Sequence, residues 1–275
     1  MVLQNFRPGV AEKLGLGSAA MCADKPALIY CNLSAFGAKG PLSDRPGFDA
    51  LMQAFGGIMA VTGEDGQAPV RAGISVVDMG TGMWCAIGIL AALNRRRDTG
   101  MGGVVDTSLY ETALGWTAYY NADVQVTGEA PKRRGSGVRG IAPYQAYQCA
   151  DGYLVVAASN DRLFAGLARE LGHGEWLEDP RFADNPSRSD HRDELNAVLV
   201  PILKAETRAH WQERLDKAGV PNAPIQLATE VVEHPQTQAL GIMQDTGQGM
   251  ALTGLPISFD GERPPLRNIA PALEE

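Results

Sequence analysis

The sequence predicts an α/β fold with a parallel sheet, followed by a smaller α+β domain. Apolar runs typical of buried strands alternate with helical patterns over the first 125 residues, and the composition changes near Thr127. The chain has 275 residues, of which 45% are hydrophobic and 20% are charged, as in an ordinary globular protein. That length is enough for one large domain or two small ones.

Strands and helices are expected in alternation through the first part of the chain. The predicted strands cover residues 26–36, 69–77 and 102–109, and the predicted helices cover 48–63, 79–97 and 109–120. The longest apolar run, residues 83–93, is too short to span a bilayer and is predicted to be part of a core helix. Alternation of this kind is typical of a parallel sheet covered by helices.

The second part of the chain has a different pattern. Residues 126–140 are polar, basic and glycine-rich, which predicts a linker and a glycine loop between a large domain, 1–125, and a small α+β domain, 141–240. Two antiparallel strands joined by a turn at Asp151–Gly152 should open the small domain, with helices over 161–171, 189–205 and 207–218. Residues 241–275 are predicted to form strand and loop, and we expect this tail to return to the large domain.

Charge and cysteine usage exclude several classes of function. The net charge is −8 and the isoelectric point is near 5.1, which argues against nucleic acid or an anionic membrane as the main partner. No signal-peptide pattern opens the chain. The cysteines (Cys22, Cys31, Cys85 and Cys149) stand far apart without a C-x-x-C pair, so they predict reduced thiols of a cytoplasmic protein and no metal site.

A single carboxylate, Asp78 in "GISVVDMGTGMW", stands at a predicted junction between strand and helix. It could simply cap the helix, because aspartate accepts backbone N–H bonds there. Gly80 and Gly82 favour a second interpretation, since each costs a helix about 1 kcal/mol relative to alanine and glycine permits close approach to the backbone. An accessible acid at this point could act as a nucleophile, kept ionised by the positive end of the helix.

The stretch "GSGVRG", residues 135–140, has the spacing G-x-G-x-x-G but not the context of a dinucleotide site. Basic residues precede it, and Pro143 prevents a helix after it. It is either a flexible linker or a mobile glycine lid whose N–H groups could face an oxyanion. The basic residues around it (Lys132, Arg133, Arg134 and Arg139) form either a solvated face or a phosphate contact.

Several longer stretches resemble one protein family. They are "QNFRPGVAEKLGLG", "PALIYCNLSAFGAKGP", "RPGFDALMQAFGGIMAVTG", "VVDMGTGMWCAIGILAALNRRRDTG", "DGYLVVAASNDRLFAGLARELG", "AGVPNAPI" and "EHPQTQALGIM". They strongly resemble the family III CoA-transferases, the group of formyl-CoA transferase and carnitine CoA-transferase, which is related to α-methylacyl-CoA racemase. The resemblance extends over nearly the whole chain.

The resemblance implies a Rossmann-like large domain that binds CoA, a smaller α+β domain and an interlocked homodimer. Relatives carry a substantial segment before "NFRPG", so we expect the sheet to be incomplete here and the chain to be a truncated form, a split gene product or a decayed paralogue. The implied partners are an acyl-CoA and a small carboxylic acid, with no permanently bound cofactor and no metal. The alternatives left open are an acyl-CoA racemase or isomerase and a non-catalytic remnant that binds only CoA or a paralogue.

The resemblance also assigns site residues. Asp78 falls on the nucleophile, which attacks an acyl-CoA thioester to give a mixed anhydride and then an aspartyl-CoA thioester. Phe48 replaces the catalytic histidine of the racemases, and phenylalanine cannot exchange a proton, which favours transfer over racemisation. The other positions implied at the CoA site are Asn5, Phe6, Lys13, Asp49, Gly80, Gly82, Gly135, Gly137, Arg139 and Gly140.

Overall fold

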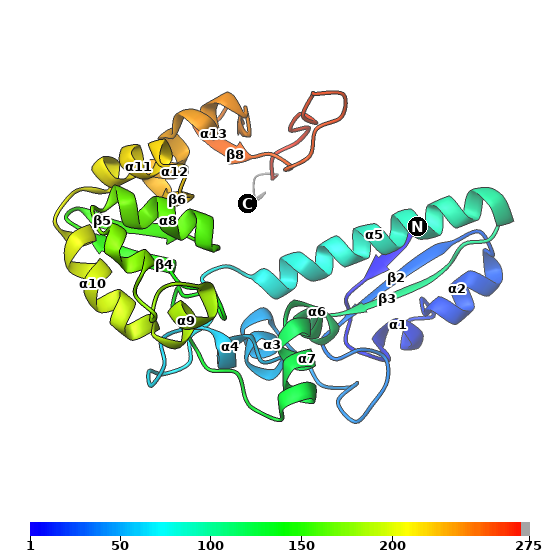
Figure 1. Cartoon of the computed structure of the whole chain (residues 1–275). Helices are drawn as coiled ribbons and strands as arrows, with labels where there is room; N and C mark the ends of the chain where they lie inside the picture. The colour runs from blue at the N-terminus through cyan, green and yellow to red at the C-terminus, as the bar shows by residue number, and fades with distance from the viewer. Residues whose placement is uncertain (271–275) are drawn as a thin grey trace. The chain divides into compact units, whose positions relative to one another are not determined.

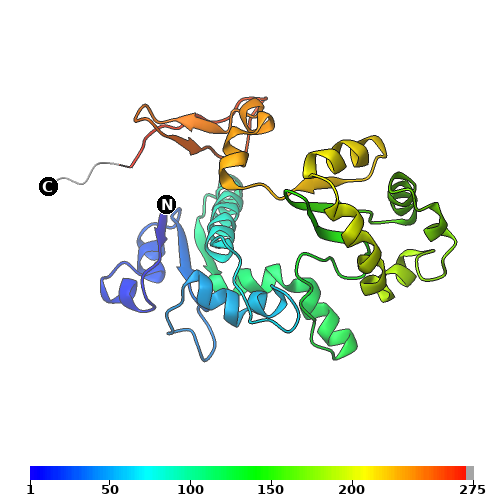
Figure 2. The same ribbon diagram turned by 90° about the vertical axis from the view of Figure 1, so that its left-hand side faces the viewer.

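The computed structural model describes residues 1–270, which divide after Arg139 into two compact units. The first unit comprises Met1–Arg139 and the second Gly140–Glu275. Figures 1 and 2 show the elements of each unit. The division falls at the end of the predicted linker. The tail belongs to the second unit, and its return to the large domain stays a prediction.

A parallel sheet organises the first unit, which confirms the α/β prediction. It consists of β1 (Val2–Gln4), β2 (Ile29–Ser34) and β3 (Gly103–Ser108), in the order β1-β2-β3 and all parallel. The register places Gln4 beside Asn32 and Asn32 beside Asp106. The carboxyl ends of the three strands therefore lie at the same edge of the sheet, where α/β proteins usually bind ligands.

The long helix α5 (Val76–Thr99) covers one face of this sheet (Figure 1). Its Cys85, Ile89 and Ala92 pack with Ile29 and Cys31 of β2 in a buried core. The opposite face meets α1 (Val10–Lys13) and α2 (Ser18–Asp24), and the buried Tyr30 hydroxyl donates to the carbonyl of Leu16 there at 2.6 Å. Helices on both faces make β2 a buried strand, as its apolar sequence predicts.

The helix α5 confirms the helix predicted over residues 79–97, beginning three residues before it and ending two residues after it. It has 24 residues, and by length and composition it is the one helix among the described residues that could cross a membrane, with a mean hydropathy of 1.7 over its most apolar window. Within the chain only 33% of that window is buried, on the face that packs against the sheet. The other elements of the first unit therefore leave the remaining apolar surface of α5 bare.

The predicted strand over residues 69–77 is wrong. Residues 69–75 have no regular structure, and Val76 and Val77 already form the first turn of α5. The backbone of this segment is held by a side chain instead of a neighbouring strand, because the Gln53 amide bonds to the N–H of Ala72 and the carbonyl of Ile74. The segment instead connects α4 (Ile58–Val61) to α5, and a second buried core lies here, formed by Met52, Ile58, Val77, Leu109 and Ala113.

Short helices support the start of α5. They are α3 (Asp49–Phe55), which follows β2, and α6 (Leu109–Trp116) and α7 (Ala118–Thr127), which follow β3. The helix α6 begins with a regular cap, because the Ser108 side chain accepts from the backbone N–H of Glu111. Together these helices place the first turn of α5 among side chains of α3 and α6.

The second unit has its own core around an antiparallel sheet of β4 (Tyr144–Cys149), β5 (Gly152–Ala157) and β6 (Asn222–Pro224). The predicted hairpin is confirmed, although Cys149 pairs with Gly152 and the turn is therefore Ala150–Asp151. The other elements of this unit are α8 (Asp161–Glu170), η1 (Gly174–Leu177), α9 (Asn185–Asp190), α10 (Arg192–Lys204), α11 (Arg208–Lys217), α12 (Ala228–Glu233), α13 (Pro235–Ala239), β7 (Met243–Asp245) and β8 (Ala251–Thr253).

Candidate active site

Asp78 lies in the first turn of α5, three residues after the N-cap position, Ser75. It is therefore not the residue that caps the helix, and Ser75 makes no side-chain cap bond either. The Asp78 side chain is exposed. A carboxylate in this position faces solvent near the positive end of a long helix, as a nucleophile for a soluble thioester would need.

The cap of α5 comes from another helix. Asp49, in the first turn of α3, is only 7% exposed, and its Oδ2 accepts from the backbone N–H of Val77 at 2.8 Å and of Asp78 at 3.1 Å. The first N–H groups of a helix have no partner within it, so this carboxylate satisfies two of them. The two acids predicted to share a site are therefore joined by a hydrogen bond.

Gln53 completes this arrangement one turn further along α3. Its side chain is fully buried, and its Nε2 donates to Asp49 Oδ1 at 2.5 Å and to the carbonyl of Ile74 at 3.3 Å. Its Oε1 accepts from the backbone N–H of Ala72 at 2.8 Å. Sequence reasoning missed Gln53, and the available signal was the spacing of four residues that places it on the same helix face as Asp49.

The electrostatics of Asp78 differ from the expectation. Although its side chain is exposed, desolvation by neighbouring atoms raises the pKa of Asp78 above its ordinary value, and the nearby charge of Asp49 raises it further. The positive end of the helix predicted a shift in the opposite direction. Desolvation, together with the like charge of the capping Asp49 carboxylate, therefore outweighs the positive end of the helix in setting the direction of this pKa shift.

The two glycines after Asp78 have different surroundings. A Cβ on Gly80 would lie 2.7 Å from Trp116 Cζ2 and 3.0 Å from Thr112 Cγ2, so what approaches the backbone here is α6 rather than a ligand. The expectation that Gly80 lets a ligand approach Asp78 is therefore wrong. Close packing of α5 against α6 explains the glycine at this position. Gly82 lies one turn after Asp78 on the same side of α5, and a Cβ there would meet nothing within 4 Å. Gly82 alone leaves open space beside the candidate nucleophile.

Three predicted residues gather in a small hollow at the carboxyl end of the sheet. Asn5, Phe6 and Phe48 line a space of about 180 Å³, together with two cations that sequence reasoning missed, Arg7 and Arg45. Phe48 precedes Asp49 directly, so the hollow and the cap of the Asp78 turn are adjacent. Arginines are suited to phosphate groups because they donate in pairs. Arg7 could have been predicted as a site residue because it directly follows Asn5 and Phe6 in "NFRPG".

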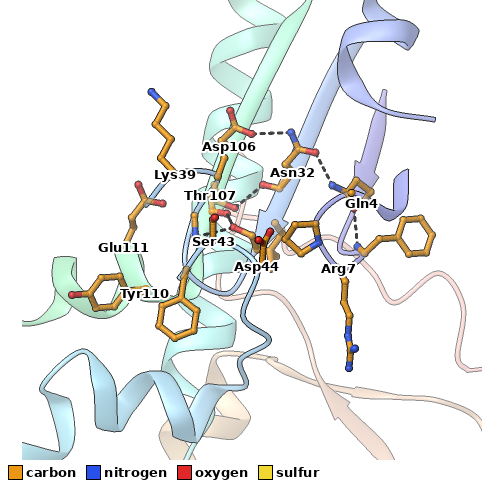
Figure 3. A pocket seen from close by; sticks show the side chains of 18 of the residues that line it. Gln4, Arg7, Asn32, Lys39, Ser43, Asp44, Asp106, Thr107, Tyr110 and Glu111 are labelled. Atoms are coloured by element: carbon orange, nitrogen blue, oxygen red, sulfur yellow. Dashed lines mark hydrogen bonds between the residues drawn. The ribbon is translucent and has the colours of Figure 1, made fainter. Parts of the chain in front are cut away.

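A larger hollow of about 790 Å³ opens beside it (Figure 3). A row of polar side chains crosses the three strands there, in which Gln4 Nε2 donates to Asn32 Oδ1 at 2.7 Å and Asn32 Nδ2 donates to Asp106 Oδ1 at 2.8 Å. Phe6 and Arg7 line this hollow too, with Lys39 on its far side (Figure 3). Asp78 and Lys13 line neither hollow, and Lys13 is exposed at the end of α1.

The residues of the predicted glycine loop each have their own partners within their units. Gly135 has a left-handed backbone, with φ at 55°, and its N–H donates to the carbonyl of Gly63 at 2.9 Å, whereas Gly137 closes a turn onto Arg134. Arg139 forms an ion pair with Asp123 of α7. Gly140 belongs to the second unit, where its carbonyl accepts from the Asn185 side chain at 2.8 Å. Their contact with CoA stays a prediction.

No metal chemistry is indicated by the described residues, among which no group of three or more His, Cys, Asp or Glu side chains is placed to hold an ion. The described residues offer an exposed carboxylate, Asp78, and separately a hollow with apolar and cationic walls. The model of CoA-transferase family III matches residues 1–275, the whole chain. The chain belongs to CoA-transferase family III.

Other members of CoA-transferase family III share much of this sequence. An acyl-CoA transferase of Fusarium pseudograminearum is 39% identical over 92% of this chain and 56% of its own length. An acetyl-CoA:oxalate CoA-transferase of Acetobacter aceti is 35% identical over 100% of this chain and 71% of its own length. The chain thus spans little more than half of the first relative and under three-quarters of the second.

Solved structures of the family share the fold. A CAIB/BAIF family protein from Brucella suis is 37% identical and superposes with a TM-score of 0.86, over 99% of this chain and 72% of that protein. A hypothetical protein from Mycobacterium tuberculosis is 30% identical, with a TM-score of 0.84 over 95% of this chain and 71% of its own. These matches support a family III fold across both units.

Proposed function

We propose that this chain carries the nucleophile of a CoA-transferase that moves CoA from an acyl-CoA to a small carboxylic acid. The names of its relatives support this proposal, because they pair an acyl-CoA with an acid such as oxalate, D-citramalate or glutarate. Coenzyme A enters as substrate, and no permanently bound cofactor is proposed.

The proposed reaction runs through covalent intermediates on Asp78. One Asp78 oxygen attacks the thioester carbonyl, the C–S bond breaks, and CoA thiolate and a mixed anhydride result. The thiolate attacks the Asp78 carbonyl of the anhydride, which releases the donor acid and leaves an aspartyl-CoA thioester. The acceptor carboxylate attacks that thioester and expels the thiolate. The thiolate then takes the acceptor acyl group, and the Asp78 carboxylate is restored.

One observation carries the proposal more than any other. The Asp49 carboxylate accepts a hydrogen bond from the backbone N–H of Asp78. Its neighbour in sequence, Phe48, lines the smaller hollow together with Asn5 and Arg7. An acid and a hollow with cationic walls are thereby joined through adjacent residues. This supports thioester chemistry better than racemisation, because Phe48 cannot carry a proton.

We also propose that the protein acts as a cytoplasmic homodimer. The bare apolar face of α5 supports a second copy as its cover, because a helix that is apolar all round is typically buried. The four cysteines are free thiols, and three of them are buried, which supports a reducing compartment.

The test is CoA transfer by the purified chain. Acetyl-CoA or succinyl-CoA is supplied with a panel of short mono- and dicarboxylic acids, and new acyl-CoA is measured by chromatography. Asp78→Ala should lower the rate by a factor on the order of 10³ or more, since nucleophile removal abolishes the covalent path. Asp98→Ala, at the exposed far end of α5, should keep the wild-type rate. Wild-type turnover by Asp78→Ala would refute the assignment.

A further inference from the structure

The start of α5 is held by side chains rather than by regular structure. Fourteen residues between α4 and α5, 62–75, form neither helix nor strand, and the N-cap residue makes no side-chain bond. The position of the first turn, and of Asp78 within it, therefore depends on what fixes the arriving segment. Two side chains of α3 fix this region: Gln53 bonds to residues 72 and 74 of the segment, and Asp49 accepts from the N–H groups of Val77 and Asp78 in the first turn of α5.

Of these two residues, Gln53 is the one that bonds both to the segment before α5 and to the Asp49 carboxylate that caps α5. Its amide binds the backbone of Ala72 and Ile74, just before the helix, and the free oxygen of the capping carboxylate of Asp49. These bonds require two donors and an acceptor at one place, which only a side-chain amide supplies. A glutamate of the same shape would lose both donors and place a second anion against Asp49.

We infer that Gln53 is a positioning residue for the nucleophile: it acts through Asp49 and residues 72–74 to hold the Asp78 carboxylate where a thioester can reach it. This inference rests on the proposed function, because it concerns the same reaction. Gln53 does not itself contact the Asp78 carboxylate among the described residues, and its 0% exposure keeps it from any substrate. Its effect should therefore appear in the chemical step and not in binding of the acyl-CoA.

The test compares Gln53→Met and Gln53→Glu with a matched control, Thr117→Val. Thr117 is a buried polar residue, 4% exposed, whose hydroxyl donates to the carbonyl of Ala113 in α6 at 3.0 Å and to that of Gly56, at the end of α3, at 3.3 Å. All variants are measured below their unfolding temperatures. Thr117→Val shows how much the rate falls when a buried hydrogen bond elsewhere in the unit is lost. The readouts are kcat, KM for acyl-CoA and the pH dependence of kcat.

We expect Gln53→Met to lower kcat about 10²-fold with KM changed less than about twofold. A small displacement of a reacting group lowers the rate of the chemical step strongly. In Gln53→Glu the added negative charge should move the acid limb of the pH profile to higher pH. Thr117→Val should change neither kcat nor the profile. Wild-type kcat and an unshifted profile in both Gln53 variants would overturn the inference.

A second readout separates this inference from the proposed function. The pKa of the Asp78 carboxyl and the hydrogen exchange of amides 72–78 are measured by NMR in the unliganded proteins. If the wild type proves inactive, yet Gln53→Glu raises that pKa and Gln53→Met deprotects those amides, the proposed function fails and the positioning role stands. If both quantities stay at wild-type values, the positioning role fails whatever the activity.

Discussion

At the scale of single residues, Asp78 combines accessibility with an unfavourable charge environment. Its pKa is raised, first by desolvation and second by Asp49, so the ionised form that must attack a thioester is destabilised in the folded protein. Active sites commonly contain a reactive group whose placement lowers the free energy of unfolding. The arrangement therefore predicts opposite effects of Asp78 on stability and on activity.

Asp78→Asn should make the protein more stable at neutral pH. A carboxyl whose folded-state pKa is raised contributes stability that is present below its unfolded pKa, about 3.9, and is lost as the pH rises through the folded value. The variant should thus unfold at a higher temperature than the wild type at pH 7, and the difference should vanish as the pH falls below about 4. Calorimetric melting from about pH 3 to pH 8 measures this. A variant less stable than wild type at pH 7 would contradict it.

The candidate site is predictable from sequence only in part. The place of Asp78 one turn before Gly82 is enough to indicate an accessible carboxylate, whereas Gly80 serves helix packing instead. Asp49 and Asp78 are 29 residues apart, and no local pattern shows that one caps the helix of the other. Gln53 was missed for the same reason, since its partners at 72 and 74 lie in a segment without regular structure.

At the scale of elements, α5 carries glycines with separate roles. Gly80→Ala should destabilise the protein by about 1–2 kcal/mol, because the added Cβ would collide with Trp116 and Thr112 of α6 and overpacking outweighs the gain in helix propensity. Gly82→Ala should stabilise it by about 1 kcal/mol, because its Cβ meets open space. Urea unfolding of the matched pair measures both.

The same pair tests access to Asp78. If the thioester approaches along the open side of α5, Gly82→Ala should slow CoA transfer despite the greater stability. Wild-type transfer by Gly82→Ala would show that the acyl-CoA arrives from another direction. A Gly80→Ala variant more stable than wild type would contradict the packing role of that glycine.

The sequence predicted the strands that pair with neighbouring strands. It failed for residues 69–77, whose backbone bonds to side chains and not to a strand. The parallel strands β2 and β3 and the hairpin β4–β5 follow from apolar runs bounded by turn residues. The segment 69–77 has the same β-rich composition, yet it pairs with no strand among the described residues and its backbone bonds to the Gln53 side chain instead. Composition alone cannot distinguish these two outcomes, because pairing depends on the rest of the sheet.

At the scale of the whole molecule, the bare face of α5 predicts self-association. Met79, Met83 and Leu90 are 63%, 59% and 65% exposed, and Ile87 between them is 51% exposed. The double variant Met83→Glu/Leu90→Glu should convert a dimer to a monomer without unfolding the first unit, because both side chains point away from the sheet core. Light scattering after size-exclusion chromatography measures the mass. A monomeric wild type, or a double variant that stays dimeric, would refute a homodimer through this face.

The most direct measurement is the mass of the intact protein after brief incubation with a panel of short acyl-CoAs, followed by peptide mapping and hydroxylamine capture. We predict an acyl or CoA adduct on the peptide that contains Asp78, lost in Asp78→Asn and released by hydroxylamine. Turnover without any adduct on that peptide, or an adduct that persists in Asp78→Asn, would contradict covalent transfer through this carboxylate.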